Sequence, residues 1–262
     1  MARLCTLASG STGNATYIST ATGDILIDAG LSCKGLKAAI DAAGCDLSNL
    51  KAVAITHTHI DHTKGLKVFL KNIRVPLIAS SQTLQGLNDI GFIPEGTKTV
   101  CCDSGNVDLC DMGVTYFKTS HDAAGSGGYV ITLPDGRRAA VCTDLGIMTN
   151  DIREHLSGCD VVLLESNHDV DMLRRGPYPA ELKLRIMSDK GHLSNIACAA
   201  ELPALLAGGT TRFVLGHLSM QNNTPLLAQA AARASLAAVG AKIGADCLLE
   251  IAKPKTVGVT AF

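Results

Sequence analysis

The chain has 262 residues, of which 47% are hydrophobic and 18% are charged, and this composition excludes a disordered chain. Its formal net charge is −1, so any grip on nucleic acid must come from a local basic patch rather than from a basic domain. The apolar stretches are short and interrupted by polar residues, which excludes a membrane span.

The amino terminus and the cysteines both indicate a cytoplasmic protein. The first residues, Met1 to Leu7, lack the apolar core of a secretory signal and lead directly into a predicted strand. The ten cysteines are scattered without a C-x-x-C pair, and most lie inside apolar runs, as Cys142 and Cys159 do. We therefore expect buried, reduced thiols rather than a disulfide framework.

The first half of the chain predicts strands followed by alternating strands and helices. Short apolar runs between turns predict strands at 4–7, 17–20, 25–28, 52–56 and 75–79. Apolar residues at helical spacing predict helices at 33–43, 62–72 and 81–90.

The second half repeats this plan. Strands are predicted at 98–101, 114–118, 128–133 and 138–143, with a hairpin turn at Asp135-Gly136. Strands at 161–164, 213–215 and 247–251 then alternate with helices at 195–206 and 225–239. The repeated plan predicts an α/β (α+β) fold with two sheets packed face to face and helices on both outer surfaces. Residues 1–262 would form a single domain with two pseudo-symmetric halves.

The strongest motif is the run His57-Thr58-His59-Ile60-Asp61-His62, which follows the predicted strand 52–56. Three imidazoles and a carboxylate are costly to place together unless a cation neutralises them. The motif therefore predicts half of a two-metal hydrolytic site. A coincidental surface cluster is the alternative.

Further His and Asp residues follow other predicted strands. His121 lies after strand 114–118, Asp144 after 138–143 and His217 after 213–215. Ligands collect beyond the carboxyl ends of strands in such folds, so we expect these side chains to meet the His motif. Mixed imidazole and carboxylate ligands suit zinc or manganese, and iron tolerates a similar set.

Together these residues resemble the metallo-β-lactamase fold superfamily over essentially the whole chain. The resemblance implies a four-layer αββα sandwich with a dinuclear metal site at one edge. One metal would take His57, His59 and His121, the other would take Asp61, His62 and His217, and Asp144 would bridge both. Asp28 matches an acidic residue that orients ligands without binding metal. Asp144 could instead be a helix N-cap, because Leu145-Gly146 leads towards a helical stretch.

Two features narrow the chemistry that the resemblance implies. An Asp rather than a Cys at the bridging position resembles the phosphodiesterase, thioesterase and nuclease branches. The element Gly191-His192-Leu193-Ser194 is similar to the G-H-x-S element of ribonuclease Z-type phosphodiesterases, in which the His assists at the scissile phosphate. A helix-capping loop histidine is the alternative for His192.

Besides the metal ligand Asp61, the candidate catalytic residues are His192, Glu165 and His168. Glu165 and His168 follow the predicted strand 161–164 and could pair with His192 and set its protonation.

Four segments together are similar to the YycJ/WalJ branch of the superfamily, whose members are described as 5′-to-3′ exonucleases on double-stranded DNA. They are residues 7–14, 165–169, 178–186 and 217–223. The resemblance implies a phosphodiester hydrolase that uses a hydroxide activated by two divalent metals, with DNA as the expected partner. A small-molecule hydrolase acting on a cyclic phosphodiester, thioester or lactam, and a non-catalytic metal-binding protein, are the alternatives.

No polymer-gripping extension is expected. The interval from Asp144 to His217 is too short for a β-CASP insertion. Grip on DNA would have to come from Lys183, Arg185 and Lys190 or from Arg174-Arg175, although a solvated face is the slightly favoured interpretation of these charges. The Gly-rich loop 9–14 allows close backbone approach to a ligand, or is simply a tight connection between strands.

Overall fold

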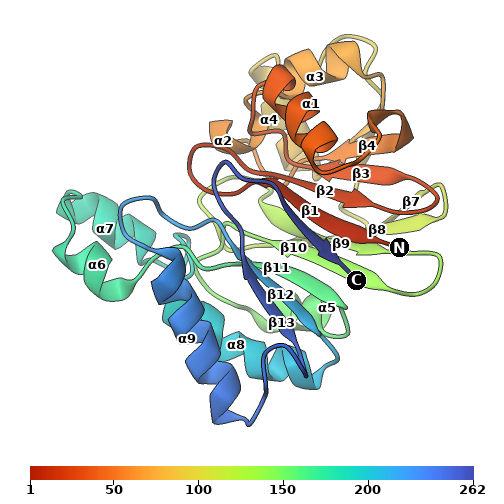
Figure 1. Ribbon diagram of the computed structural model, residues 1–262. Helices are drawn as coiled ribbons and strands as arrows, with labels where there is room; N and C mark the ends of the chain where they lie inside the picture. Colours follow the sequence, from red (N-terminus) through yellow and green to blue (C-terminus); the bar gives the residue numbers. More distant parts are fainter.

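The computed structural model describes all residues from 1 to 262 and contains two mixed β-sheets covered by helices (Figure 1). The spatial order of the first sheet is β14 (Gly258–Ala261), β1 (Arg3–Ala8), β2 (Ala15–Ser19), β3 (Asp24–Ile27), β4 (Leu50–Ala54), β5 (Leu77–Ala79) and β6 (Thr99–Cys101). The second sheet has the order β13 (Leu248–Ile251), β12 (Arg212–Gly216), β11 (Val161–Glu165), β10 (Arg138–Cys142), β9 (Gly127–Thr132), β8 (Met112–Lys118) and β7 (Asn106–Leu109).

The two sheets share one pairing pattern, so the two halves do follow a common plan. In the first sheet β14, β1, β2 and β3 pair antiparallel, and β3 to β6 pair parallel. In the second sheet β7 to β10 pair antiparallel, and β10 to β13 pair parallel. The C-terminal strand β14 completes the first half by pairing with β1, at the other end of the chain.

Three apolar clusters separate four layers, which confirms the predicted sandwich. One cluster lies between the sheets and includes Ile27, Ala54, Tyr129 and Val141. The other two lie on the outer faces of the sheets, under the helices (Figure 1). Burial of apolar area on both faces of each sheet explains why the central strands are nearly continuous apolar runs.

Helices cover the outside and begin at polar caps. The outer helices are α1 (Cys33–Ala42), α2 (Ile60–Thr63), α3 (Leu66–Asn72), α4 (Ser81–Asp89), α5 (Asn150–Leu156), α8 (Asn195–Ala207) and α9 (Pro225–Ala238). A short 3-10 turn, Leu47–Asn49, precedes β4. The hydroxyls of Ser32, Ser80, Thr149, Ser194 and Thr224 accept a hydrogen bond from the first turn of α1, α4, α5, α8 and α9. None of the helices combines the length and the apolar character needed to cross a membrane.

The structure differs from the sequence-based expectations at several elements. The helix predicted at 62–72 is divided into α2 and α3 around Gly65, where an added Cβ would lie 2.0 Å from the Leu31 carbonyl oxygen. Strands β7 and β14 and helices α6 (Val170–Arg175) and α7 (Ala180–Ile186) were not predicted. Helices α6 and α7 project from the sandwich on the side of the His motif (Figure 1).

Candidate metal centre

The centre lies where strands of both sheets end. Asp28 follows β3 directly, the His motif begins after β4, Asp144 lies just beyond β10, and His217 follows β12 directly. Asp28, Asp144 and His217 have φ angles of 64°, 61° and 54°, in the left-handed region that residues with a Cβ rarely adopt. This strained conformation, repeated after three strands, is typical of functional positions.

The first group of candidate ligands consists of the imidazole nitrogens of His57, His59 and His121. The Nδ1 atom of His59 lies 3.0 Å from His57 Nε2 and 3.3 Å from His121 Nε2. The three nitrogens thus face one small volume, and ring protons on all of them would clash. A cation held by their lone pairs resolves this arrangement.

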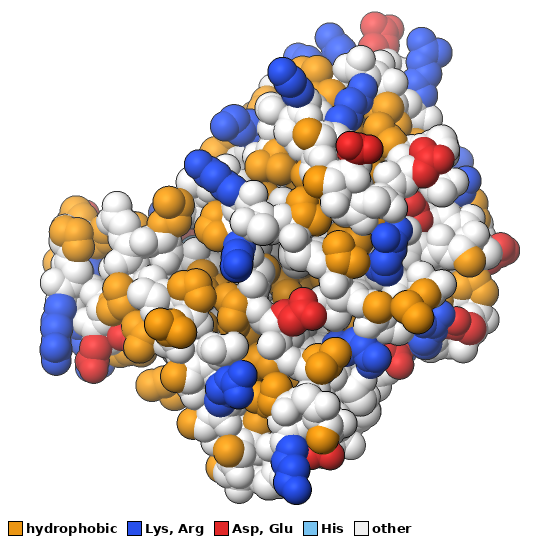
Figure 2. Space-filling view, in the orientation of Figure 1, with side chains coloured by type: hydrophobic (Ala, Val, Ile, Leu, Met, Phe, Trp, Pro, Cys, Tyr) orange, Lys and Arg blue, Asp and Glu red, His pale blue; other side chains and the backbone are white.

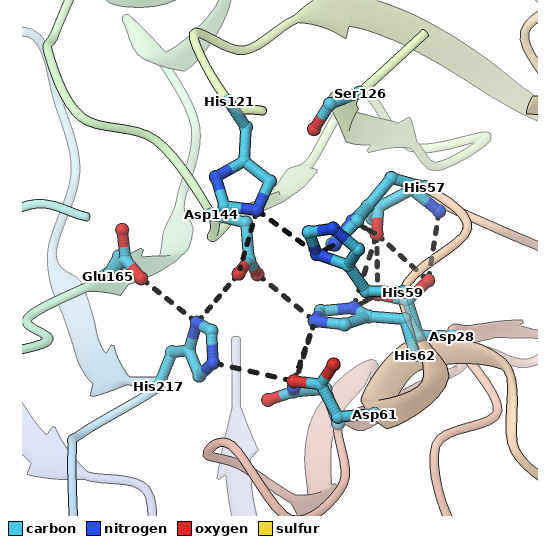
Figure 3. A network of polar contacts seen from close by, with 12 residues as sticks. Asp28, His57, His59, Asp61, His62, His121, Ser126, Asp144, Glu165 and His217 are labelled. Atoms are coloured by element: carbon cyan, nitrogen blue, oxygen red, sulfur yellow. Dashed lines mark hydrogen bonds and ion pairs between the residues drawn. The ribbon is translucent and has the colours of Figure 1, made fainter. Parts of the chain in front are cut away.

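The second group consists of Asp61, His62 and His217, and Asp144 lies between the two groups (Figure 3). Asp61 Oδ2 lies 3.6 Å from His62 Nε2 and 3.8 Å from His217 Nε2. Asp144 Oδ2 lies 3.2 Å from His62 Nε2 in this group, and Asp144 Oδ1 lies 3.9 Å from His121 Nε2 in the other. The seven predicted ligand residues therefore converge, with one carboxylate reaching both groups.

Hydrogen bonds at the far side of the rings fix the orientation of three histidines. His62 Nδ1 donates to Asp28 at 2.7 Å, and His121 Nδ1 donates to the Gly191 carbonyl at 3.1 Å. His57 Nδ1 donates to the Thr56 hydroxyl at 3.0 Å, and that hydroxyl donates in turn to Asp28. With one proton placed on Nδ1, each of these rings can offer the lone pair of Nε2 to a metal.

The charges of the centre are strongly coupled. Burial alone would raise the pKa of the Asp144 carboxyl, but His217 and His62 hold that pKa well below its usual range. Burial opposes protonation of His62, but Asp144 and Asp28 raise its pKa well above the usual value. Burial, assisted by the neighbouring His62, lowers the pKa of His57 well below the usual value.

The donor set fits divalent cations. Asp144 Oδ2 is buried and makes no hydrogen bond, although His62 Nε2 lies close to it. A buried carboxylate oxygen without a hydrogen bond is costly, and coordination to a cation would satisfy it. Nitrogen and oxygen donors without sulfur suit zinc, manganese or iron.

His192 and Glu165 lie next to the second group, outside the two ligand sets. His192 Nδ1 donates to Glu165 Oε1 at 2.8 Å, and His217 Nδ1 lies 2.9 Å from the same oxygen. Burial works against protonation of His192, but Glu165 raises its pKa above the usual value. The predicted pairing of Glu165 with His192 is therefore present in the structure.

His168 is placed differently from the expectation. Its side chain is buried, its Nδ1 atom makes no hydrogen bond, and the hydrogen-bond partner of His192 is Glu165. The alternative role of Asp144 as a helix N-cap is wrong, because Thr149 caps the next helix, α5.

Four further residues support the centre and were not singled out from the sequence. Asn14 Nδ2 lies 3.2 Å from Asp61 Oδ2 and 2.9 Å from His62 Nε2. Ser9 accepts a hydrogen bond from the His217 backbone N–H at 2.7 Å. Asn14 and Ser9 both belong to the Gly-rich loop 9–14, and this loop was the sequence feature that could have pointed to them. The other two residues, Thr56 and Asp122, belong to no motif that indicated a role at the centre.

A cavity of roughly 210 Å³ opens in front of the centre. It is lined by metal-centre residues and His192, and by side chains of Ser11, Asp122, Tyr178 and Arg185. Substrate therefore reaches the ligand cluster from this side.

A two-sheet αββα sandwich with such a centre at one edge defines a metallo-β-lactamase-fold protein. The chain belongs to this superfamily: the family model described as "Beta-lactamase superfamily domain" matches residues 24–218. Within it, the chain is similar to the YycJ/WalJ branch.

Two relatives represent that branch. Exodeoxyribonuclease YycJ of Bacillus anthracis is 34% identical over 250 residues, covering 95% of this chain and 94% of the relative. Exodeoxyribonuclease WalJ of Streptococcus pneumoniae serotype 2 is 33% identical over 253 residues, again covering 95% of this chain and 94% of the relative.

Solved structures agree on the fold. The metallo-β-lactamase fold protein YhfI from Bacillus subtilis aligns with a TM-score of 0.68 at 15% identity, covering 99% of this chain and 100% of that chain. Zn²⁺-bound PqqB from Methylobacterium extorquens aligns with a TM-score of 0.68 at 17% identity, covering 97% of this chain and 99% of that chain.

Proposed function

We propose that this chain is a metal-dependent phosphodiester hydrolase that degrades DNA from an end, with 5′-to-3′ polarity. The observation that carries the proposal is the Asp144 carboxylate between two groups of His and Asp side chains, beside the hydrogen-bonded pair of His192 and Glu165. The relatives named exodeoxyribonuclease, which align over nearly the full chain, support the same substrate. They do not favour the alternative of a small-molecule hydrolase.

Seven residues would hold two divalent ions. His57 Nε2, His59 Nδ1 and His121 Nε2 would form one site, Asp61, His62 and His217 would form the other, and Asp144 would serve both. When bound, such ions lower the pKa of a shared water and offset the charge of a phosphate. Zinc or manganese is the expected metal, and iron is compatible with the same donors.

The chain's own proton donor in this site is His192. Because Nδ1 is engaged by Glu165, Nε2 is the nitrogen left for the substrate. Glu165 raises the pKa of His192, which favours the doubly protonated ring, and such a ring can pass its Nε2 proton to the departing alkoxide oxygen. Glu165, which is fully buried, keeps the ring oriented and stabilises its positive charge.

No hydrogen bond joins the His168 ring to Glu165 or His192, so its proposed part is limited to shaping the buried loop after β11. The Asn195 backbone N–H donates to the His168 carbonyl at 2.8 Å, and this hydrogen bond ties the loop to the start of α8. A cytoplasmic location, expected from the scattered cysteines, is part of the same proposal.

The test is hydrolysis of duplex DNA labelled at either the 5′ or the 3′ end, by protein loaded with zinc or manganese. We expect release of nucleotides from the 5′ end, and loss of both metal and hydrolysis in His59→Ala and Asp144→Ala. Bis-p-nitrophenyl phosphate, a thioester and nitrocefin are assayed in parallel. Turnover of the thioester or nitrocefin without turnover of DNA would refute the proposal.

A further inference from the structure

Helices α6 and α7 form an arm, residues Val170–Ile186, that contributes little to the core but reaches the cavity. The structure buries no side chain of α7 fully, so hydrophobic packing does not account for this helix. Nevertheless Tyr178, Leu182, Arg185 and Ile186 of the arm line the cavity in front of the metal centre. The arm is thus one wall of the substrate site.

The base of this wall is fixed to the centre. The His192 backbone N–H donates to the Ile186 carbonyl at 2.9 Å, and His121 Nδ1 donates to the Gly191 carbonyl. An added Cβ on Gly191 would lie 2.2 Å from the Ile186 carbonyl oxygen, so the two segments are in close contact. The end of α7 therefore has a defined position relative to both a metal ligand and the proton donor.

Arg185 presents an unused pair of donors to the cavity. Its Nε donates to Asp122, whose other oxygen lies 3.4 Å from His121 Nε2 and 3.8 Å from His59 Nε2. The two terminal amino groups of Arg185 make no hydrogen bond or ion pair within the protein, and 58% of the side chain is exposed. A guanidinium held through Nε leaves its amino groups for two parallel hydrogen bonds to a phosphate.

The rest of the wall is apolar and aromatic. Tyr178, Leu182 and Ile186 face the cavity together with Arg185, while Ser11, Asn167 and Ser219 line it elsewhere. An aromatic ring beside a guanidinium is a combination that binds a base by stacking and the linked phosphate by charge. Elsewhere on the face seen in Figure 2, Lys and Arg side chains are scattered and form no continuous basic band.

We propose that the arm binds the nucleotide adjacent to the scissile bond, with Arg185 on its phosphate and Tyr178 against its base. This inference rests on the proposed function and adds its substrate contacts. The sequence offered Arg185 as one candidate for grip on DNA but slightly favoured a solvated face; in the structure Arg185 lines the cavity, whereas Arg174 and Arg175 do not.

The experiment compares DNA with bis-p-nitrophenyl phosphate, which reaches the metal centre but has no neighbouring nucleotide. Arg185→Ala should raise KM for DNA about tenfold to a hundredfold, and Tyr178→Ala should raise it about fivefold to a hundredfold. Tyr178→Ala should hydrolyse the small diester within about twofold of wild type, and Arg185→Ala should lose a much smaller factor on the small diester than on DNA. Tyr178→Phe should retain DNA affinity, and Arg185→Lys should recover only part of it.

Arg175→Ala is the matched control, because it removes the same charge from the same arm outside the cavity. The slope of log kcat/KM for DNA against log salt concentration should become shallower by about one in Arg185→Ala, which corresponds to one counterion. It should remain unchanged in Arg175→Ala. An equal effect of both variants would overturn the proposal, as would loss of bound metal or of small-diester hydrolysis in Arg185→Ala. If wild type cleaves neither substrate, the proposed function itself fails, which is a distinct result.

Discussion

Glu165 places one buried carboxylate between a proposed metal ligand, His217, and the proposed proton donor, His192. It accepts hydrogen bonds from His192 Nδ1 and from the backbone N–H groups of Leu145 at 3.1 Å and Leu193 at 3.0 Å, and His217 Nδ1 lies 2.9 Å from it. Burial alone would raise its pKa, but His192 and His217 lower that pKa to about 2. A carboxylate that accepts three hydrogen bonds stays ionised and holds the His192 ring in one orientation.

This arrangement predicts a large difference between His192, which is partly exposed, and His168, which is buried. We expect His192→Ala to lower kcat on DNA by about 10²–10⁴-fold while both metals remain bound, because only the proton donor is lost. His168→Asn, which removes a ring without polar contacts to the centre, should change kcat by less than about tenfold. Single-turnover rates and metal analysis of the two variants provide the measurement. Equal losses in both would show that the loop after β11, and not the His192 proton, controls the rate.

His168 should instead affect acid stability. Burial lowers its pKa to about 4, below the usual value of 6.5, so the unfolded chain takes up the proton first as the pH falls. The free energy of unfolding should therefore be unaffected above pH 6.5 and should fall between pH 6.5 and pH 4, by up to about 3 kcal/mol from this group. Its exposed fraction is only 2%, so solvent screening is small.

Urea unfolding of metal-free protein measures this effect. The loss of stability from pH 7 to pH 4.5 should be smaller in His168→Asn than in wild type. An identical pH dependence in both proteins would assign the acid sensitivity to other groups.

At the scale of elements, the sequence predicted best the strands that deliver the site. Strands β3, β4, β10 and β12 are buried on nearly every residue, so their apolar runs are visible without knowledge of the fold. Strand β7 is short and half exposed, and β14 depends on pairing with β1 at the opposite terminus. Such pairing is decided by tertiary contacts that no local pattern encodes.

The candidate site likewise divides into residues that the sequence predicted and residues that it did not. The His motif and the histidines after strands were predictable because ligands must follow strand ends in this architecture. Asn14, Thr56 and Asp122 act through hydrogen bonds or ion pairs that the fold brings about, some between loops distant in sequence. Helix α7 of the arm was not predicted because none of its side chains is buried, so its sequence lacks the apolar face by which a helix is usually recognised.

Close packing of three loops around Gly30 gives an element-scale prediction. Gly30 donates to the Asn14 carbonyl, Asn14 donates to the Asp61 carbonyl, and an added Cβ on Gly30 would lie 1.7 Å from that Asp61 oxygen. Gly30→Ala must therefore displace backbone, and we expect it to destabilise the protein by about 1–3 kcal/mol or more.

The displaced residues include a proposed ligand, so metal affinity should fall together with stability. Denaturant unfolding and metal titration measure both quantities. Gly96→Ala is the control, because no atom lies within 4 Å of a Cβ there, although its positive φ adds some strain. Wild-type metal affinity in Gly30→Ala would contradict the close contact.

At the scale of the whole molecule, the centre lies across the two halves. His57, His59, Asp61 and His62 follow β4 of the first sheet, whereas His121, Asp144 and His217 follow β8, β10 and β12 of the second. Ions held by both groups would therefore act as a clamp between the sheets.

This clamp predicts that metal stabilises the entire fold and not only its loops. At free metal about 1,000-fold above Kd, binding adds about 4 kcal/mol to the free energy of unfolding, or roughly 10 °C in Tm for a domain of this size. Chelation should reverse the shift, and His121→Ala, which removes the second sheet's ligand from the first group, should reduce it by more than half. His155→Ala, on helix α5 outside the ligand groups, should keep the full shift. Calorimetry with and without chelator measures Tm, and a Tm that is insensitive to metal loss would mean that the apolar contact between the sheets alone sets the stability of the sandwich.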